Sequence, residues 1–311
     1  MTALPPWLFS TASNAENGYA RHMSVAVVDC AIRAKGRRGG MAEFTIPGSY
    51  SISNEEYHKL PHVGKSDLDR VRRSVGHYLA ERENPTPPTP ALLLGQAVHC
   101  AILEPLQFTE LFIVAPTLDK RTSGGKSAWQ DFLDSSGGKQ VLTPDQWELV
   151  HRVQEAVLSH PVAGGLFVGG VAEESLLWRD EETGILMKAR PDYRKLSNGL
   201  LLDLKTTSNA SWPAFGDSVT RYRYHVQGAV YLDGVKAVHG QDSDQFLLVA
   251  AEKEPPYSVA CYLLSGFSID RGRKKYRRDL RKLKTYLDSE DQWAGYPLEI
   301  QEVDPPEWEE D

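Results

Sequence analysis

Two residues of opposite charge stand at the end of an apolar run, in the stretch LLLDLKTT at residues 200–207. Charged side chains are almost never fully buried unless they are paired. Because a β-strand turns alternate side chains to opposite faces, Asp203 and Lys205 are expected to share one face. An ion pair at a strand end is the simplest interpretation, and the neighbouring strands decide whether the pair does chemistry.

A hairpin brings a second acid to the same face. Asn198-Gly199 is the strongest short hairpin signal in the chain, and it separates two runs with strand periodicity, 184–196 and 199–207. If this dipeptide is the turn, Asp192 lies opposite Lys205, with a possible slip of a residue or two. Asp203 then lies one step along the same face.

A second turn extends the meander backwards to the strand predicted at 171–180. The turn residues DEETG (180–184) place Asp192 opposite residue 172 or 173. Four residues are therefore expected together at one end of one sheet face: Glu173, Asp192, Asp203 and Lys205.

Three carboxylates so close together favour a bound cation. At roughly 4–6 Å they repel and raise each other's pKa. A divalent ion removes that repulsion, and oxygen ligands suit Mg²⁺ or Mn²⁺. The alternative is an acid cluster around a lysine at the surface, which would have only a structural role.

Other periodic segments must hold this meander in place. Helical spacing or capping signals predict helices at 53–60, 64–83, 91–105, 143–167, 212–236 and 268–287. Strands are predicted at 245–253 and 257–264. Residues 118–139 contain two glycine pairs and are expected to form an exposed loop region.

The domain boundaries follow from where periodicity starts and stops. Residues 1–40 lack a convincing period and are expected to be a poorly ordered extension before a natural beginning at Met41. One domain with a helical N-terminal part is expected over 41–300, followed by an acidic tail at 301–311.

Composition limits the classes of protein. The chain has 311 residues and a net charge of −7, which argues against non-specific nucleic-acid binding overall. Its three cysteines form no CxxC motif, which suits a reducing cytosol. No run of 18 apolar residues and no signal peptide is apparent. A cytoplasmic protein without a membrane span is therefore expected.

Four motifs in order give the chain a family resemblance. Pro191-Asp192, ten residues and then Asp203-Leu204-Lys205 resemble the PD-(D/E)xK nuclease signature. The segments GQAVH (95–99), AEESLLW (172–178) and VQGAVY (226–231) resemble the upstream helix, acidic strand and downstream helix of its RecB-like branch. The closest likeness is to RecE-type (exodeoxyribonuclease VIII-like) phage and prophage exonucleases, over about residues 50–300. It implies an α/β restriction-endonuclease-like core, with a central mixed β-sheet flanked by α-helices.

The resemblance implies roles for the site residues. Asp192, Asp203, His99 and the backbone carbonyl of Leu204 would bind two Mg²⁺ or Mn²⁺ ions. Lys205 would orient or activate the attacking water, and the acid of the AEESLLW strand would complete the catalytic set. Taken alone, His99 on an apolar helix is more often a core residue than a ligand, and Gly95 one turn earlier would let backbone approach closely.

The acidic strand leaves one choice open, because Glu173 and Glu174 are adjacent. Strand alternation allows only one of them to face the metals. Both the pairing register and the family spacing favour Glu173, with Glu174 facing away.

Contacts to DNA are expected from two helices. The resemblance gives Gln227 and Tyr231, one turn apart, a role in DNA contact and in support of the site. The dense cations of 270–284 set a local field that net charge does not describe. The leading candidates for phosphate contact are Arg271, Arg273, Lys274, Lys275, Arg277 and Arg278. The simpler interpretation is a solvated helix face.

The implied function is metal-dependent hydrolysis of linear double-stranded DNA from its ends, 5′ to 3′, in phage-type recombination. The resemblance also implies a ring-shaped homo-oligomer and a single-strand annealing recombinase as a partner. Alternatives are a structure-specific or restriction-type endonuclease, and a DNA-binding module that has lost catalysis. Polarity, end preference and oligomer size stay open.

Overall fold

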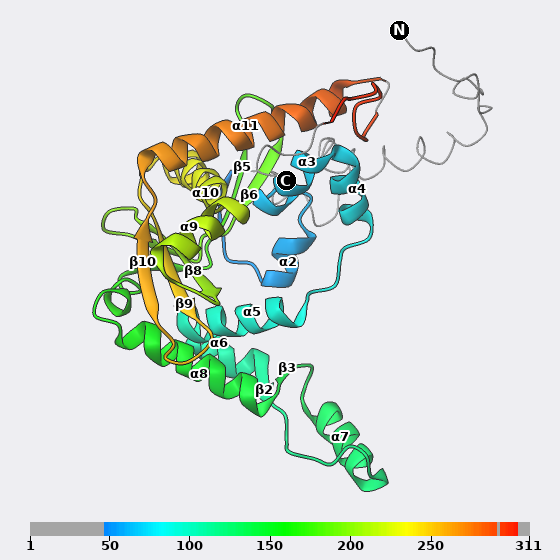
Figure 1. Ribbon diagram of the computed structural model, residues 1–311, viewed down its shortest axis with the longest axis vertical. Coiled ribbons are helices and arrows are strands. Elements are labelled where there is room, and N and C mark those ends of the chain that lie inside the picture. The colour runs from blue at the N-terminus through cyan, green and yellow to red at the C-terminus, as the bar shows by residue number, and fades with distance from the viewer. Residues whose placement is uncertain (1–46, 291–292, 304–311) are drawn as a thin grey trace, which may run out of the picture.

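A computed structural model describes residues 47–290 and 293–303 (Figure 1). The expected extension 1–40 and all but the first three residues of the expected acidic tail lie outside this part of the chain. In the part described, no helix is both long and apolar enough to cross a membrane.

A five-stranded mixed sheet forms the centre of the fold, as predicted. Its strands run in the order β10 (Val259–Leu263), β9 (Phe246–Glu252), β8 (Leu201–Thr207), β7 (Tyr193–Lys195) and β4 (Gly170–Ala172). The central pair β8–β9 is parallel and the other pairs are antiparallel. The strand that carries Asp203 and Lys205 therefore lies between two others, in the most buried position that the sheet offers.

A second sheet continues the meander beyond a bend. It contains β1 (Gly48–Tyr50), β5 (Ser175–Arg179) and β6 (Leu186–Ala189) in the order β1-β5-β6. The strands predicted as single runs at 171–180 and 184–196 are each broken in two. The first breaks at Glu173, whose φ is +48°, a backbone conformation that non-glycine residues seldom adopt. The second breaks at Pro191, which has no N–H for a ladder.

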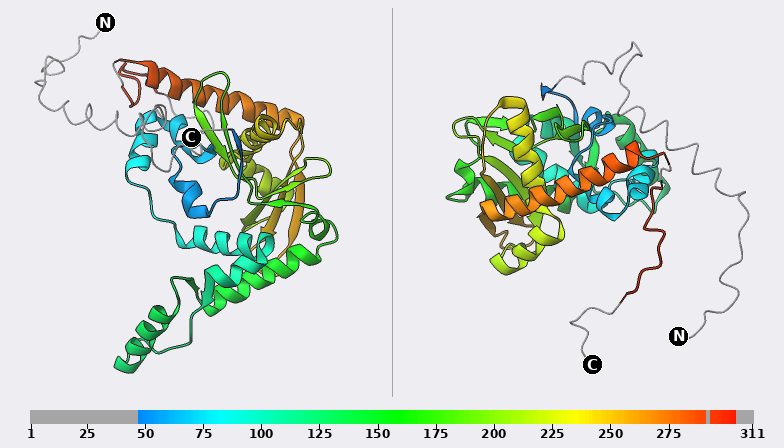
Figure 2. Two further views of the ribbon diagram at one scale, coloured as in Figure 1. Left: turned by 180° about the vertical axis from the view of Figure 1, so that it is seen from behind. Right: turned by 90° about the horizontal axis from the view of Figure 1, so that it is seen from above.

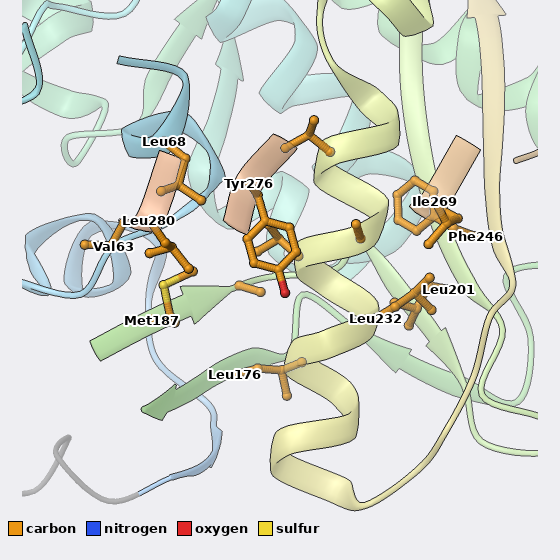
Figure 3. Packing of buried hydrophobic residues seen from close by; sticks show 14 of the residues in the cluster. Val63, Leu68, Leu176, Met187, Leu201, Leu232, Phe246, Ile269, Tyr276 and Leu280 are labelled. Atoms are coloured by element: carbon orange, nitrogen blue, oxygen red, sulfur yellow. The ribbon is translucent and has the colours of Figure 1, made fainter. Parts of the chain in front are cut away.

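Helices cover both faces of the five-stranded sheet. On one face lie α9 (Trp212–Arg221), α10 (Tyr224–His239) and α11 (Gly266–Asp288), and on the other lie α5 (Pro90–Leu103), α6 (Pro105–Leu111) and α8 (Pro144–Ser159) (Figure 1). Alternation along β8 divides the core, since Leu201 packs toward α10 and Leu204 packs toward α5 and α8. Figure 3 shows apolar side chains, among them Leu201, Leu232 and Phe246, packed around α10.

Three predicted helices differ in their bounds. The segment 64–83 forms α3 (Lys65–Arg73) and α4 (Val75–Glu83), because Ser74 is extended and caps the second helix. The segment 212–236 breaks before α10 at Arg223, which has a φ of +57°. Helix α8 starts at its Thr143 cap as predicted but ends at Ser159, two residues before a proline that disfavours helical backbone. The helix predicted at 53–60 is present as α2 (Asn54–Lys59), near the start of the described residues.

The region 118–139 is a helix rather than the expected loop, although it is exposed as predicted. Thr122 accepts a hydrogen bond from the Gly125 N–H and starts α7 (Ser123–Ser135), so a capping side chain offsets the glycines of the first turn. Helix α7 has no buried residue and lies apart from the main body in Figure 2. It is carried by the parallel pair β2 (Phe112–Val114) and β3 (Gln140–Leu142).

Candidate active site

The bend between the two sheets brings two predicted acids together. The Glu173 N–H donates to the Asp192 carbonyl at 3.1 Å, so the two residues lie opposite each other as the DEETG turn predicts. His99 on α5 completes a group in which one ligand atom from each residue lies within 4.8 Å of the others. A Cβ on Gly95 would meet only Thr206 Oγ1, at 3.9 Å, so the expected close backbone approach there is wrong.

The register of the β7–β8 hairpin differs by two residues from the prediction. Tyr193 pairs with Leu202, which places Asp192 beside Asp203 instead of Lys205. An even shift keeps every side chain on its predicted face. Asp192 Oδ2 accepts the Leu204 N–H at 2.7 Å and lies 3.4 Å from His99 Nδ1. The backbone amide of Leu204 thus fixes the carboxylate of Asp192. The metal-binding role expected for the Leu204 carbonyl stays a prediction.

Asp203 and Lys205 form an ion pair on β8, as the simplest interpretation of the strand expects. The Asp203 side chain is fully buried, and that of Lys205 is 17% exposed. Lys205 Nζ also lies 4.9 Å from the ring centroid of Tyr224. Burial opposes the charge on Lys205, but the carboxylates of Asp203 and Asp192 outweigh it and raise its pKa above the ordinary value. The ammonium form of Lys205 is therefore the stable one here.

Helix α10 supports the buried acid from the other side. Gln227 Nε2 donates to Asp203 Oδ1 at 2.7 Å and lies 3.2 Å from the Tyr231 hydroxyl. Gln227 is 9% exposed. This geometry fits the expected support of the site and leaves Gln227 little surface for DNA contact, while Tyr231 is only partly buried and its expected DNA contact stays a prediction.

The cluster contains more negative charge than its own cations balance. Burial, followed by the charge of Asp192, raises the pKa of Glu173 to about 8. Burial raises the pKa of Asp192 and of Asp203 to about 6, against the opposing effect of Lys205. Burial and Lys205 lower the pKa of His99 to about 4, so its imidazole is neutral near pH 7. Carboxylate oxygens with one neutral imidazole are a donor set that fits a divalent cation.

Glu174 faces a different environment, as the sequence predicted. It forms a buried ion pair with Arg194, in which Nε donates to Oε2 at 2.7 Å. Ser49 and His239 also contact its Oε1, at 2.7 and 3.0 Å. These partners could not be identified from sequence, because Ser49 and His239 are far from Glu174 along the chain.

The basic helix α11 divides its predicted cations between two environments. Arg273 forms ion pairs with Asp233 and Asp270, and Arg277 pairs with Asp180 and lies 3.9 Å from Asp233. Those two arginines are engaged by carboxylates, which weakens the case for a phosphate role. The other predicted contacts lie on other parts of the helix surface: Arg271, Lys274, Lys275 and Arg278.

The sequence patterns did not predict two residues that lie near the site, Tyr224 and Lys65. Tyr224 lies three residues before Gln227, a spacing that places both on one helix face. Lys65, at the start of α3, donates to the Tyr222 carbonyl at 2.7 Å and pairs with Asp69. The helical spacing could have revealed Tyr224, but no local signal brings Lys65 to α10.

Comparison with known proteins agrees with this geometry. Residues 65–296 match the family described as a PDDEXK-like domain of unknown function (DUF3799). The chain belongs to this family. Its fold is similar to the crystal structure of a candidate exonuclease from Eubacterium rectale, with a TM-score of 0.51, 18% identity, and coverage of 76% of this chain and 87% of that one.

A second solved structure, that of SSO0001, has a TM-score of 0.28 and 17% identity over 64% of this chain and 87% of its own, a similarity too low to bear on the fold. No curated protein matches the sequence. Family membership supports a nuclease of the PD-(D/E)xK superfamily, whose members usually use divalent metals. The RecE-type branch is a finer assignment that stays a prediction.

Proposed function

We propose that this family member is a metal-dependent exodeoxyribonuclease of RecE type, which hydrolyses linear double-stranded DNA from its ends in the 5′-to-3′ direction. The observation that carries the proposal is the cluster of His99, Glu173 and Asp192, which lies next to the buried ion pair of Asp203 and Lys205. These residues occupy the signature positions within the matched family region.

The residues of the cluster would divide the work of phosphodiester hydrolysis. His99, Glu173, Asp192 and Asp203 would hold one or two Mg²⁺ or Mn²⁺ ions, which when bound supply Lewis-acid stabilisation of the developing phosphate charge. The ammonium of Lys205 would donate to a phosphate oxygen or hold the attacking water in line. Gln227 would fix the orientation of the Asp203 carboxylate through its 2.7 Å hydrogen bond.

Further parts of the proposal rest on the family resemblance. They are a ring-shaped homo-oligomer around the DNA, action at double-stranded ends, and a single-strand annealing recombinase that receives the product in phage-type recombination. A structure-specific or restriction-type endonuclease is the alternative activity that the same cluster supports.

The test uses end-labelled linear duplex and covalently closed circular DNA of the same sequence. With Mg²⁺ or Mn²⁺, the proposal expects stepwise loss of the linear duplex from its ends and an intact circle. Ca²⁺ should allow DNA binding without turnover, because it tolerates longer and less regular oxygen coordination. Cutting of the circle would favour the endonuclease, and cleavage that survives a chelator would contradict the metal requirement.

A further inference from the structure

Helix α11 carries its cations in two stripes with opposite surroundings. One stripe contains Arg273, Arg277, Arg281 and Lys284, and each of its members forms an ion pair with a carboxylate. The other stripe, at helical spacing of four, three and four residues, contains Arg271, Lys275, Arg278 and Lys282, of which only Arg278 pairs with a carboxylate, that of the adjacent Asp279. Only the second stripe lies beside the start of α10 and helix α3, since Lys275 contacts His225 and Lys282 donates to the Arg72 carbonyl.

Lys275 and Arg271 are the cations of this second stripe whose charge is most available. Across residues 47–290 and 293–303, no carboxylate forms an ion pair with either of them. Lys275 Nζ lies 3.0 Å from His225 Nε2. Partial burial and the neighbouring cations, with Arg271 first among them, lower the pKa of Lys275. A bound polyanion would stabilise the unpaired charges of Arg271 and Lys275 in this group.

A glycine places this stripe against the helix that supports the active site. A Cβ on Gly272 would lie 2.0 Å from the His225 carbonyl oxygen, so α11 crosses the first turn of α10 in direct backbone contact (Figure 1). His225 is the neighbour of Tyr224, whose ring centroid lies 4.9 Å from Lys205 Nζ. The second stripe therefore contacts α10 at His225, next to the tyrosine whose ring lies beside Lys205.

Exposed aromatic rings accompany these cations. Tyr222 is 51% exposed and its ring stacks with Tyr224 at 5.7 Å and 26°. Phe267 is 71% exposed, and the Arg271 guanidinium lies 5.6 Å from its ring centroid. Because a duplex already stacks its bases internally, exposed rings beside cations offer more to unpaired bases, and such stacking contributes about 1–3 kcal/mol per base.

We propose that this surface binds single-stranded DNA that runs to or from Lys205, with phosphates on the cations and bases on the exposed rings. We call it the aromatic–basic track and define it by Tyr222, Tyr224, Phe267, Arg271 and Lys275. The inference rests on the proposed nuclease function and deepens it, because it assigns one strand of the substrate to a named face of the molecule.

The test measures binding by fluorescence anisotropy in the presence of a chelator, with a labelled single strand and with the matching blunt duplex. Tyr222→Ala should weaken single-strand binding by about fivefold or more, which corresponds to the lower part of the stacking range. Lys275→Glu should also weaken single-strand binding, because it removes a phosphate contact. Tyr222→Ala should leave duplex affinity unchanged. Lys275→Glu should also flatten the salt dependence by about one phosphate contact.

Two variants serve as matched controls. Tyr222→Phe keeps the ring and should bind as the wild type does. Arg281→Glu makes the same change of charge as Lys275→Glu, but on the paired stripe, where Arg281 contacts Glu182 at the surface. It should leave single-strand affinity nearly unchanged. Thermal melting of each variant checks that a loss of binding does not come from unfolding.

The outcomes separate the track from the proposed function. If Tyr222→Ala and Lys275→Glu bind the single strand as tightly as the wild type, the track is overturned, even if the protein degrades DNA as proposed. Equal losses for single strand and duplex overturn the single-strand assignment. If the wild type never cleaves DNA, the proposed activity is contradicted. If Tyr222→Ala and Lys275→Glu still lose single-strand binding while the controls do not, the track is supported all the same.

Discussion

Glu173 and Glu174 are consecutive acids in opposite electrostatic environments, the first partly buried and the second buried. Glu174 meets Arg194, Ser49 and His239, which outweigh the effect of burial and lower its pKa. Glu173 meets Asp192 instead, and its pKa rises to about 8. The backbone bend at Glu173 separates the two environments, because it directs one side chain toward Asp192 and His99 and the next toward β7 and α10.

The difference separates an acid that is balanced within the fold from one to which we assign a role in function. A carboxylate whose charge is balanced within the fold stabilises that fold and has no further use for a cation. A carboxylate that burial and another acid destabilise is held in place by the surrounding structure, and it is available to a divalent ion or a substrate. We therefore expect substitutions on the two sides of the bend to affect different measurements.

The largest expected effect is on catalysis, at Asp203. Asp203→Ala removes a cluster carboxylate and the partner of Lys205, and loss of one group that stabilises transition-state charge typically reduces the rate by about 10²–10³-fold. We expect at least that loss of cleavage with a folded protein, measured on end-labelled duplex with Mg²⁺. Asp242→Ala, which breaks only the exposed pair with Lys236, is the control and should cleave normally. Normal cleavage by Asp203→Ala would remove Asp203 from the site.

The next effect is on stability, at the balanced acid. Arg194→Met leaves Glu174 buried without its main partner, and breaking a buried ion pair in this way costs about 3–5 kcal/mol. Chemical denaturation should show this loss, and the double variant Glu174→Leu with Arg194→Met should recover much of it. A single variant as stable as the wild type would show that Glu174 is not balanced by Arg194.

A smaller effect is expected where Gln227 of α10 supports Asp203. Gln227→Leu removes the 2.7 Å hydrogen bond to Asp203 and replaces the amide with an apolar side chain of similar size. Loss of an outer contact to a metal-binding group typically reduces activity or metal affinity by about 10–100-fold. Steady-state cleavage across a Mg²⁺ titration should show the decrease, partly restored by high metal. Full activity at low Mg²⁺ would mean that Asp203 needs no such support.

The smallest effect concerns the pH dependence of stability without metal. The folded pKa of Glu173, about 8, lies above its ordinary value of 4.5. Its contribution to stability is therefore fully present below the lower value and is lost as the pH rises through the higher one. In chelator, the melting temperature of the wild type should fall between about pH 4.5 and pH 8, and that of Glu173→Gln should fall less, by a few degrees. Parallel curves would contradict the raised pKa.

Local rules predicted which acids share a face but not every pairing between strands. Strand alternation and the DEETG turn placed Glu173 opposite Asp192 and turned Glu174 away. The β7–β8 register shifted by two residues, which alternation alone cannot detect because an even shift preserves each face. Similarly, nothing local predicts that Arg223 interrupts a helix, since the Asp69 and Asp279 that hold it come from α3 and α11.

The cations of α11 illustrate the same limit for function. Charge density predicted phosphate contact for six residues, but density does not reveal which cations already have partners. Asp180 and Asp233, which engage Arg273 and Arg277, lie 40 or more positions away in the chain. Only the folded arrangement separates the paired stripe from the aromatic–basic track.

The central claim is that the unbalanced acids on the catalytic side of the bend bind a divalent cation. Isothermal titration with Mn²⁺ tests it most directly, using the wild type, Asp192→Asn and Glu174→Gln. The account predicts stoichiometric binding to the wild type, its loss or severe weakening in Asp192→Asn, and its retention in Glu174→Gln. Equal Mn²⁺ affinity in wild type and Asp192→Asn, or no binding to the wild type, would contradict it.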